Sequence, residues 1–265
     1  MGIVNVSPDS FSGDGLADVE EAVAKAKQLA SEGADIIDVG GESTRPGSTP
    51  VSIDEELRRI VPVVGKLAKE VSVPLCVDTY KLEVARQALD AGANMINDIW
   101  GLQKGAGLAE LAAQKAVPIV LMSNQRDSPC QDIMPEVVSD LKRAIKQALE
   151  AGVSWESIIV DPGIGFGKTQ QQNLEILRRL EELTILGRPI LLGSSRKSFI
   201  GWVLDLTPER RSNRMAFVPP SDQRLEGTAA TIAIGIAKGA DIVRVHDVKE
   251  MARVCKMSDA IVRGV

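Results

Sequence analysis

The sequence predicts a single-domain α/β protein, a (β/α)8 or TIM barrel with its active site at the carboxyl ends of the strands. Two observations lead to this prediction. Short apolar segments alternate with longer segments of helical periodicity along all 265 residues, and eight such strand–helix units can be counted. The apolar segments are mostly continuous rather than alternating, which is typical of parallel strands covered on both faces.

The eight predicted strands are rich in Ile, Val and Leu. They cover Gly2–Val6, Asp35–Val39, Pro74–Asp78, Met95–Ile99, Pro118–Met122, Ser157–Asp161, Pro189–Gly193 and Asp241–His246. The first predicted helix places Val19, Val23 and Leu29 on one face and ends at Gly33, which supplies a left-handed cap. The same periodicity recurs in Asp54–Val71, Leu82–Ala91, Gly107–Gln114, Pro135–Ala151 and Gln170–Leu183.

A doubly wound open sheet is the alternative fold, but its GxGxxG fingerprint does not follow an early strand. One barrel domain is therefore expected to span residues 1–265. Residues 205–226 interrupt the rhythm with three prolines and mixed charge, and we expect them to form an exposed insertion within the seventh helical layer.

Composition excludes several classes of partner and places the chain in the cytoplasm. The net charge is −5 and aromatic residues make up 3%, which argues against nucleic-acid or anionic-membrane binding. No apolar run is long enough to span a membrane, and no signal peptide begins the sequence. Cys76, Cys130 and Cys255 form no CxxC pair and are interpreted as free thiols. A single histidine excludes a His-rich metal site.

Polar residues gather where the predicted strands end, which is where barrel enzymes hold their active sites. They are Asn5, Asp38, Asp78, Asn97, Asp98, Asp161, Ser194, Ser195, Arg196, Lys197, Arg244, His246 and Asp247. Each alone reads as a cap or turn residue. So many on one rim indicate a polar ligand, because buried polar groups need partners.

The types of these residues indicate the chemical groups that the ligand carries. Asp and Asn side chains can pair with the amide and amino groups of a heterocycle, and a carboxylate can accept two parallel donors. Arg45, Lys197, Arg244 and His246 supply positive or donor groups for an anion. The loops 7–15 and 40–47 combine proline, glycine and polar residues as lids do, and the glycine-rich loop 161–168 is not a P-loop. A hydrogen-bonding ring joined to phosphate fits this pattern.

At this point the residues resemble the dihydropteroate synthase family. The motifs, in order along the chain, are MGIVNVSPDSFSGDG (1–15), DVGGESTRPG (38–47), VDTYK (77–81), NDI (97–99), DPGIGFGK (161–168), GSSRKSFIG (193–201) and RVHDV (244–248). The resemblance implies a (β/α)8 barrel that joins 6-hydroxymethyl-7,8-dihydropterin diphosphate to 4-aminobenzoate and releases diphosphate. It also implies Mg2+ as cofactor and a homodimer.

The resemblance further implies roles for individual residues. The pterin ring would be held by Asp78, Asn97, Asp161 and Lys197, with Arg244 stacking near it. The diphosphate would contact Asn5, Arg244 and His246, and Asn5 would help bind the metal. Lys197, Arg244 and Asp161 would be the catalytic residues. The aminobenzoate site and its closing loops would contain Phe11, Thr44, Arg45, Pro46, Phe166 and Ser195.

Three features depart from the family pattern. The loop after strand five reads Met122-Ser123-Asn124-Gln125-Arg126-Asp127-Ser128-Pro129 and lacks the usual histidine. The first strand follows Met1 directly, whereas family members usually carry residues before it. The insertion at 205–226 is the third.

Two other functions remain open on the sequence. A pterin-binding barrel of the corrinoid methyltransferase type would share the ring-binding Asp and Asn but would not need the ESTRPG and SRKS motifs. A noncatalytic pterin-binding or scaffolding barrel would keep the motifs without turnover. The two intact motifs favour the synthase, as does the retention of Asn5, Arg45, Lys197, Arg244 and His246.

Overall fold

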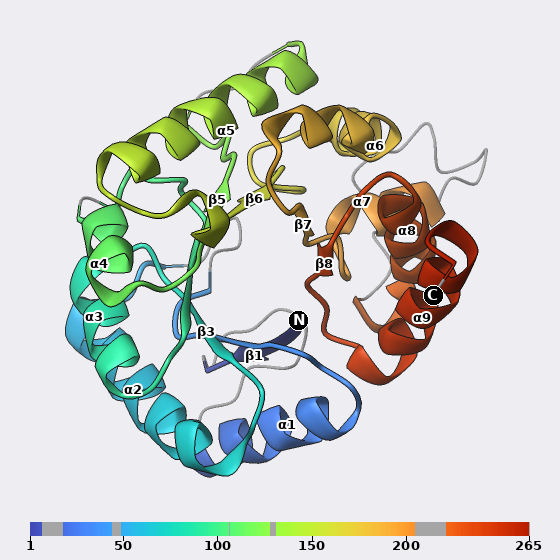
Figure 1. Cartoon of the computed structure of the whole chain (residues 1–265). Helices are drawn as coiled ribbons and strands as arrows, with labels where there is room; N and C mark the ends of the chain where they lie inside the picture. The colour runs from blue at the N-terminus through green and yellow to red at the C-terminus, as the bar shows by residue number, and fades with distance from the viewer. Residues whose placement is uncertain (7–17, 44–48, 106, 128–130, 205–220, 265) are drawn as a thin grey trace.

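The computed structural model describes residues 1–6, 18–43, 49–105, 107–127, 131–204 and 221–264. Parallel strands form a central ring in these residues, and helices surround it (Figure 1). The predicted (β/α)8 barrel is confirmed.

The strands follow one another around the ring in sequence order. They are β1 (Gly2–Asn5), β2 (Ile37–Gly40), β3 (Leu75–Asp78), β4 (Met95–Asp98), β5 (Ile119–Met122), β6 (Ile158–Asp161), β7 (Leu191–Leu192) and β8 (Ile242–Val243). Strands β1 to β6 form one parallel sheet, and β7 pairs with β8. Single parallel bridges, Val160 with Ile190 and Gly2 with Val245, join these two groups at both junctions.

The helices of the outer layer lie between successive strands. They are α1 (Val19–Ser31), α2 (Ile53–Glu70), α3 (Leu82–Asp90), α4 (Leu108–Lys115), α5 (Ile133–Glu150), α6 (Gln170–Arg178), α7 (Ser198–Leu204), α8 (Leu225–Ala237) and α9 (Val248–Val262), with short 3-10 segments η1 (Trp155–Ser157), η2 (Leu180–Leu186) and η3 (Ser221–Arg224). Local signals explain several starts: Ser52 caps α2, and Thr169 with Gln172 forms a capping box at α6. None of the described helices is both long and apolar enough to cross a membrane.

The structure corrects some predicted boundaries. Strands β7 and β8 are shorter than the predicted Pro189–Gly193 and Asp241–His246, because regular pairing is limited to two residues in each. The predicted helix Gln170–Leu183 divides at Arg179, where η2 takes over. Residues 205–220 of the predicted insertion lie outside the described residues, but Ser221–Arg224 form η3 and α8 begins at Leu225.

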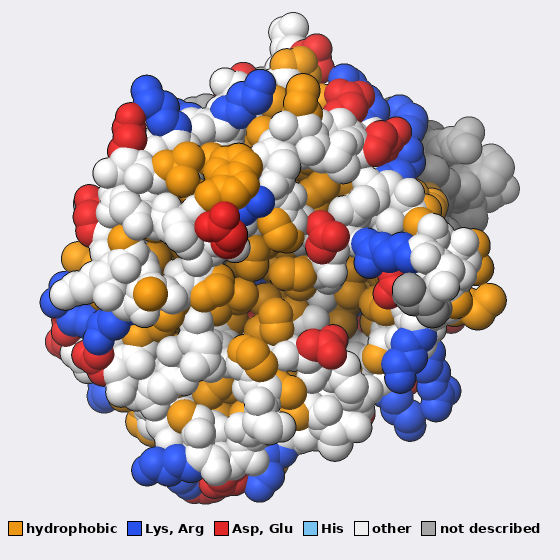
Figure 2. Space-filling view, viewed as in Figure 1, with side chains coloured by type: hydrophobic (Ala, Val, Ile, Leu, Met, Phe, Trp, Pro, Cys, Tyr) orange, Lys and Arg blue, Asp and Glu red, His pale blue; other side chains and the backbone are white. Residues whose placement is uncertain are grey.

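Strand alternation divides the barrel interior into two layers. Side chains of Met1, Cys76, Met95, Val120, Ile159 and Leu191 form a buried apolar cluster, with Ile36 and Ile242 against it. Figure 2 shows hydrophobic side chains gathered over the barrel axis on the face where the strands begin. Two residues further along several of these strands the side chains point to the same interior but are polar. The apolar layer thus forms a floor beneath the polar rim.

Candidate functional site

The polar layer above this floor contains the predicted ring-binding residues. Cys76 is followed on β3 by Asp78, Met95 on β4 by Asn97, and Ile159 on β6 by Asp161. The strand register keeps them level, because Asp78 pairs with Asn97 across β3 and β4. Asn97 and Asp161 are buried, with exposed fractions of 3% and 6%. Residues from three strands therefore meet in one layer, as predicted.

Arg244 enters this layer from the end of β8 and binds two carboxylates. Its Nε donates to Asp38 Oδ2 at 2.6 Å, and its Nη2 donates to Asp78 Oδ2 at 2.7 Å. Asn97 Nδ2 also donates to Asp38 Oδ2, at 3.3 Å. Arg244 thus connects β8 to β2 and β3 inside the barrel.

Burial decides the charge states around Arg244. It raises the pKa of Asp78 to about 7; Arg244 opposes that rise and Asp38 adds to it. Burial also acts to lower the pKa of Arg244, but Asp38 and Asp78 outweigh it and keep that pKa raised. Asp38 Oδ1 and Asp78 Oδ1 are buried without a hydrogen-bond partner in the described part of the chain. A ligand with donor groups would satisfy such oxygens.

Asp161 and Lys197 form the second charged group of the layer. Asp161 Oδ1 accepts a 2.7 Å hydrogen bond from Gly163 N. Burial raises the pKa of Asp161, against that hydrogen bond and the charge of Lys197. Burial also lowers the pKa of Lys197 to about 7, and Asp161 opposes the change. Each group is therefore displaced toward its neutral form.

Phe166 is placed beside Lys197 by the loop after β6. The Lys197 Nζ atom lies 4.2 Å from the centroid of the Phe166 ring, and Arg126 Cζ lies 4.5 Å from it. The backbone conformation of this loop requires glycine: Gly163 and Gly167 both have φ of +70°. A Cβ atom at Gly163 would lie 2.0 Å from the Ser123 carbonyl oxygen. The loop after β6 is thus pressed against the loop after β5.

The loop after β5, which lacks the family's usual histidine, is well bonded at its start. Ser123, Asn124 and Gln125 are buried. Ser123 Oγ and Gln125 Nε2 donate to Asp140 Oδ2 at 3.0 and 2.6 Å. Asn124 Nδ2 donates to the Ile99 carbonyl at 2.9 Å. These polar residues fix the loop to α5 and to the end of β4.

His246 lies beside Ser195 at the ends of β8 and β7. Ser195 Oγ is 3.0 Å from His246 Nδ1, and His246 N donates to the same oxygen at 3.2 Å. His246 and Asn5 both line a cavity of about 220 Å³ that extends between α1 and α9. The predicted diphosphate contacts Asn5 and His246 are therefore brought together, while Arg244 is bound to Asp38 and Asp78.

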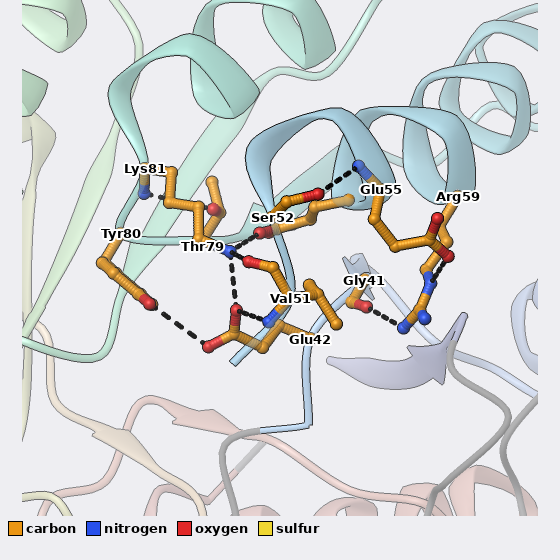
Figure 3. Close-up of polar contacts among 10 residues, drawn as sticks. Gly41, Glu42, Val51, Ser52, Glu55, Arg59, Thr79, Tyr80 and Lys81 are labelled. Carbon is orange, nitrogen blue, oxygen red and sulfur yellow. Dashed lines mark hydrogen bonds and ion pairs between the residues drawn. The ribbon is translucent and has the colours of Figure 1, made fainter. Parts of the chain in front are cut away.

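A buried ion cluster holds the base of the second loop (Figure 3). Lys81 Nζ donates to Glu42 Oε2 and Glu56 Oε2, both at 2.6 Å, and to the Val51 carbonyl at 2.8 Å. Glu42 Oε2 also accepts from Val51 N at 3.1 Å, and Tyr80 OH donates to Glu42 Oε1 at 3.3 Å. Glu42 and Val51 stand on either side of residues 44–48, so the cluster joins the two ends of that loop.

Four predicted residues, Phe11, Thr44, Arg45 and Pro46, lie outside the described residues. The sequence predicts Asp38 at a strand end, but Asp38 is not among the predicted site residues. The structure places it at the centre of the polar layer. The signal was available, since Asp38 stands two residues after Ile36 just as Asp78 stands two after Cys76. Lys168, which donates to the carbonyls of Ser123 and Phe166, was also left out.

Comparison with known proteins decides the family. The model of the pterin-binding enzymes matches residues 1–246. A dihydropteroate synthase of Bacillus subtilis is 51% identical over 262 residues, covering 98% of this chain and 87% of its own. The chain belongs to the dihydropteroate synthase family of pterin-binding enzymes.

Solved dihydropteroate synthases share the fold over nearly the whole chain. A Clostridium difficile structure determined in the presence of pteroic acid has 48% identity and a TM-score of 0.90, and it covers 99% of this chain and 96% of its own. A Xanthomonas albilineans structure in complex with 7,8-dihydropteroate has 37% identity and a TM-score of 0.85, with coverage of 100% and 92%. The protein is accordingly a transferase.

Proposed function

We propose that the protein condenses 6-hydroxymethyl-7,8-dihydropterin diphosphate with 4-aminobenzoate, forming 7,8-dihydropteroate and diphosphate. The observation that carries this proposal is the layer of Asp78, Asn97 and Asp161 above the apolar floor of the barrel. The side-chain oxygens of these residues can accept hydrogen bonds from the N–H groups along one edge of a pterin. The complexes that relatives form with 4-aminobenzoic acid and 7,8-dihydropteroate support it.

In this proposal the ring binds by pairing its donors with buried oxygens. Asp161 accepts two parallel N–H groups, and Asp78 Oδ1, which has no partner in the described part of the chain, accepts another. Asn97 and Lys197 complete the contacts, with Arg244 beside the ring. A bound ring that donates to Asp161 favours its ionised form, which in turn favours a protonated Lys197.

The remaining roles divide between two sides of the ring. On the diphosphate side, Asn5 and His246 share one cavity, and we assign Arg244 to the same group. On the aminobenzoate side, Phe166 and Lys197 present an aromatic face and a cation. Thr44, Arg45, Phe11 and Pro46 are assigned to this side and its closing loops by the family resemblance alone. The same resemblance also places Ser195 on this side.

The reaction needs no protein nucleophile. The C–O bond at the pterin methylene breaks, diphosphate leaves with the electron pair, and the electron-rich dihydropterin stabilises the methylene cation. The arylamine nitrogen then attacks that carbon, and the proton that it loses passes to the solvent. Asp161 favours the cationic ring, and the donors of Arg244 and His246 stabilise the leaving anion. Trapping or isotope effects that show no cationic character would contradict this dissociative route.

Mg2+ is proposed as the cofactor. Asn5 places an amide oxygen at the end of β1 beside the cavity that His246 lines. Magnesium prefers oxygen ligands and commonly takes one or two from the protein together with substrate phosphates. The amide of Asn5 fits such a ligand, and the ion would supply positive charge to the diphosphate.

We also propose a homodimer that acts in the cytoplasm. Ile234 on α8 and Met257 and Ile261 on α9 are large apolar side chains with exposed fractions of 50%, 63% and 72%. The two helices pack together on one side of the barrel (Figure 1), so these residues offer an apolar surface for a second copy. The free thiols of Cys76 and Cys255 suit a reducing compartment.

One assay separates the proposed function from its alternatives. The purified chain, given pterin diphosphate, 4-aminobenzoate and Mg2+, is expected to form dihydropteroate and diphosphate in equal amounts. Methyl transfer to a corrinoid without dihydropteroate would identify the methyltransferase class instead. Pterin binding without turnover at saturating Mg2+ would identify a noncatalytic barrel.

A further inference from the structure

We propose that Ser195 is a positioning residue for His246: it holds the imidazole as the neutral tautomer that carries its proton on Nε2. The inference deepens the proposed function, since it rests on the assignment of His246 to the diphosphate. It also gives Ser195 a role on that side of the ring rather than at the aminobenzoate.

The hydrogen atoms around Ser195 Oγ determine which tautomer of His246 is present. The backbone N–H of His246 can only donate, so Ser195 Oγ accepts that hydrogen bond at 3.2 Å. The hydroxyl has one hydrogen of its own to donate. Ser195 is buried, with an exposed fraction of 4%, so leaving that hydrogen without an acceptor is unfavourable.

His246 Nδ1 lies 3.0 Å from Ser195 Oγ and is the only acceptor for this hydroxyl among the residues that the structure describes. The hydroxyl therefore donates to Nδ1, which must be unprotonated. In a neutral imidazole the single ring proton then lies on Nε2. An imidazolium, or the other tautomer, would place two hydrogens between the same two atoms.

The Nε2 proton of His246 has a use in the proposed function. His246 lines the cavity that also contains Asn5, and the charged groups around that cavity are Lys25, Glu32, Arg196, Asp247, Lys249 and Glu250. Arg196 is bound to Asp247, with its Nε 2.9 Å from Asp247 Oδ2. A neutral imidazole held with N–H on Nε2 is a fixed donor for a diphosphate oxygen and needs no change of protonation when the anion binds or leaves.

The tautomer can be observed directly, because His246 is the single histidine of the chain. We would record the imidazole signals of the ¹⁵N-labelled full chain, purified without a histidine tag, at pH 8, where histidine is ordinarily neutral. The expected spectrum has an unprotonated Nδ1 and a protonated Nε2. In Ser195→Ala the Nδ1 signal should move toward the average of two exchanging tautomers, and Ser195→Thr should restore it.

Ser194→Ala is the matched control, since Ser194 Oγ is a buried hydroxyl at the same strand end but bonds to Thr231 at 2.8 Å. Its histidine spectrum should equal that of the wild type. A proton on Nδ1 in the wild type, or an unchanged spectrum in Ser195→Ala, would overturn the proposal. These spectra need no substrate, so they stand even if synthase activity is absent.

Kinetics give the second readout. In Ser195→Ala, the KM for pterin diphosphate and the inhibition constant for inorganic diphosphate should rise by about 2- to 10-fold, as expected for one lost hydrogen bond. The KM for 4-aminobenzoate should not change. A rise confined to the KM for 4-aminobenzoate would overturn the role of Ser195 on the diphosphate side.

Discussion

At the scale of single residues, the charge states of the polar layer are set by burial. Lys197 and Asp161 share one side of the barrel mouth, yet burial moves the pKa of each toward its neutral form. Arg244 instead keeps its charge because two carboxylates surround it. The polar layer thus contains one ion cluster, Arg244 with Asp38 and Asp78, and one pair, Lys197 with Asp161, whose charge would change when a ligand binds.

The lowered pKa of Lys197 can be measured through the pH dependence of the free energy of unfolding. This pKa falls from an ordinary value near 10.5 to about 7 in the folded protein, so between these values the unfolded chain binds the extra proton. The stability of the wild type relative to Lys197→Met should therefore rise as the pH increases from 7 to 10. Urea unfolding at several pH values measures it. A difference that stays constant or falls over that range would contradict the burial of a displaced lysine.

At the scale of elements, loops are held by contacts that only the folded chain reveals. The loop after β6 fits against the loop after β5 because glycine leaves space for the facing backbone. A Cβ atom at Gly167 would lie 2.3 Å from Arg126 N, whereas one at Gly152, which also has a positive φ, would meet nothing nearer than 3.5 Å. The two glycines therefore share a conformational requirement but differ in the space around them.

Alanine substitutions separate these two requirements. Gly152→Ala should cost about 1–2 kcal/mol of stability, the usual cost of a left-handed non-glycine residue. Gly167→Ala should cost about 1–3 kcal/mol more because the loops must move apart. It should also raise the KM for 4-aminobenzoate, since Phe166 precedes it. Thermal unfolding and steady-state kinetics test both effects, and equal behaviour of the two variants would refute the close packing of the loops.

The ion cluster at the base of the second loop makes a further prediction. Lys81→Met would leave Glu56, whose side chain is 1% exposed, and Glu42 without their cation. Breaking such a buried pair typically costs about 3–5 kcal/mol. Lys115→Met removes a pair with Asp90 whose side chains are 39% and 55% exposed, and should cost at most about 1 kcal/mol. If chemical unfolding showed similar losses of unfolding free energy for the two variants, this would contradict the burial of the Lys81 cluster.

The strand-end residues can be predicted from the sequence, but their hydrogen-bond partners cannot. Alternation along β3, β4 and β6 was enough to bring Asp78, Asn97 and Asp161 together. The bonds from Arg244 to Asp38 and Asp78 could not be predicted, because β8 meets β2 and β3 only across the interior of the closed ring. The hydrogen bonds of Gln125 to Asp140 likewise depend on how α5 packs over its own loop.

At the scale of the whole molecule, the apolar residues that stabilise the barrel interior and the polar residues of the candidate site lie at opposite ends of the barrel axis. The apolar floor closes the end where the strands begin (Figure 2), and the polar layer occupies the other end. The overall charge of −5 conceals this arrangement, because Lys197 and Arg244 are gathered inside the mouth. We propose that the single histidine, which argued against a His-rich metal site, serves the anion side of that mouth.

The central claim is that this polar layer binds the pterin ring, and an equilibrium titration of pterin diphosphate without 4-aminobenzoate tests it most directly. The wild type should bind, and Asp161→Asn should weaken binding by about 10- to 100-fold, the worth of a hydrogen bond to a charged group. Asp98→Asn, which changes a buried carboxylate bonded to the backbone of Trp100 and Leu102, should bind like the wild type. Undiminished binding by a folded Asp161→Asn variant would contradict the account.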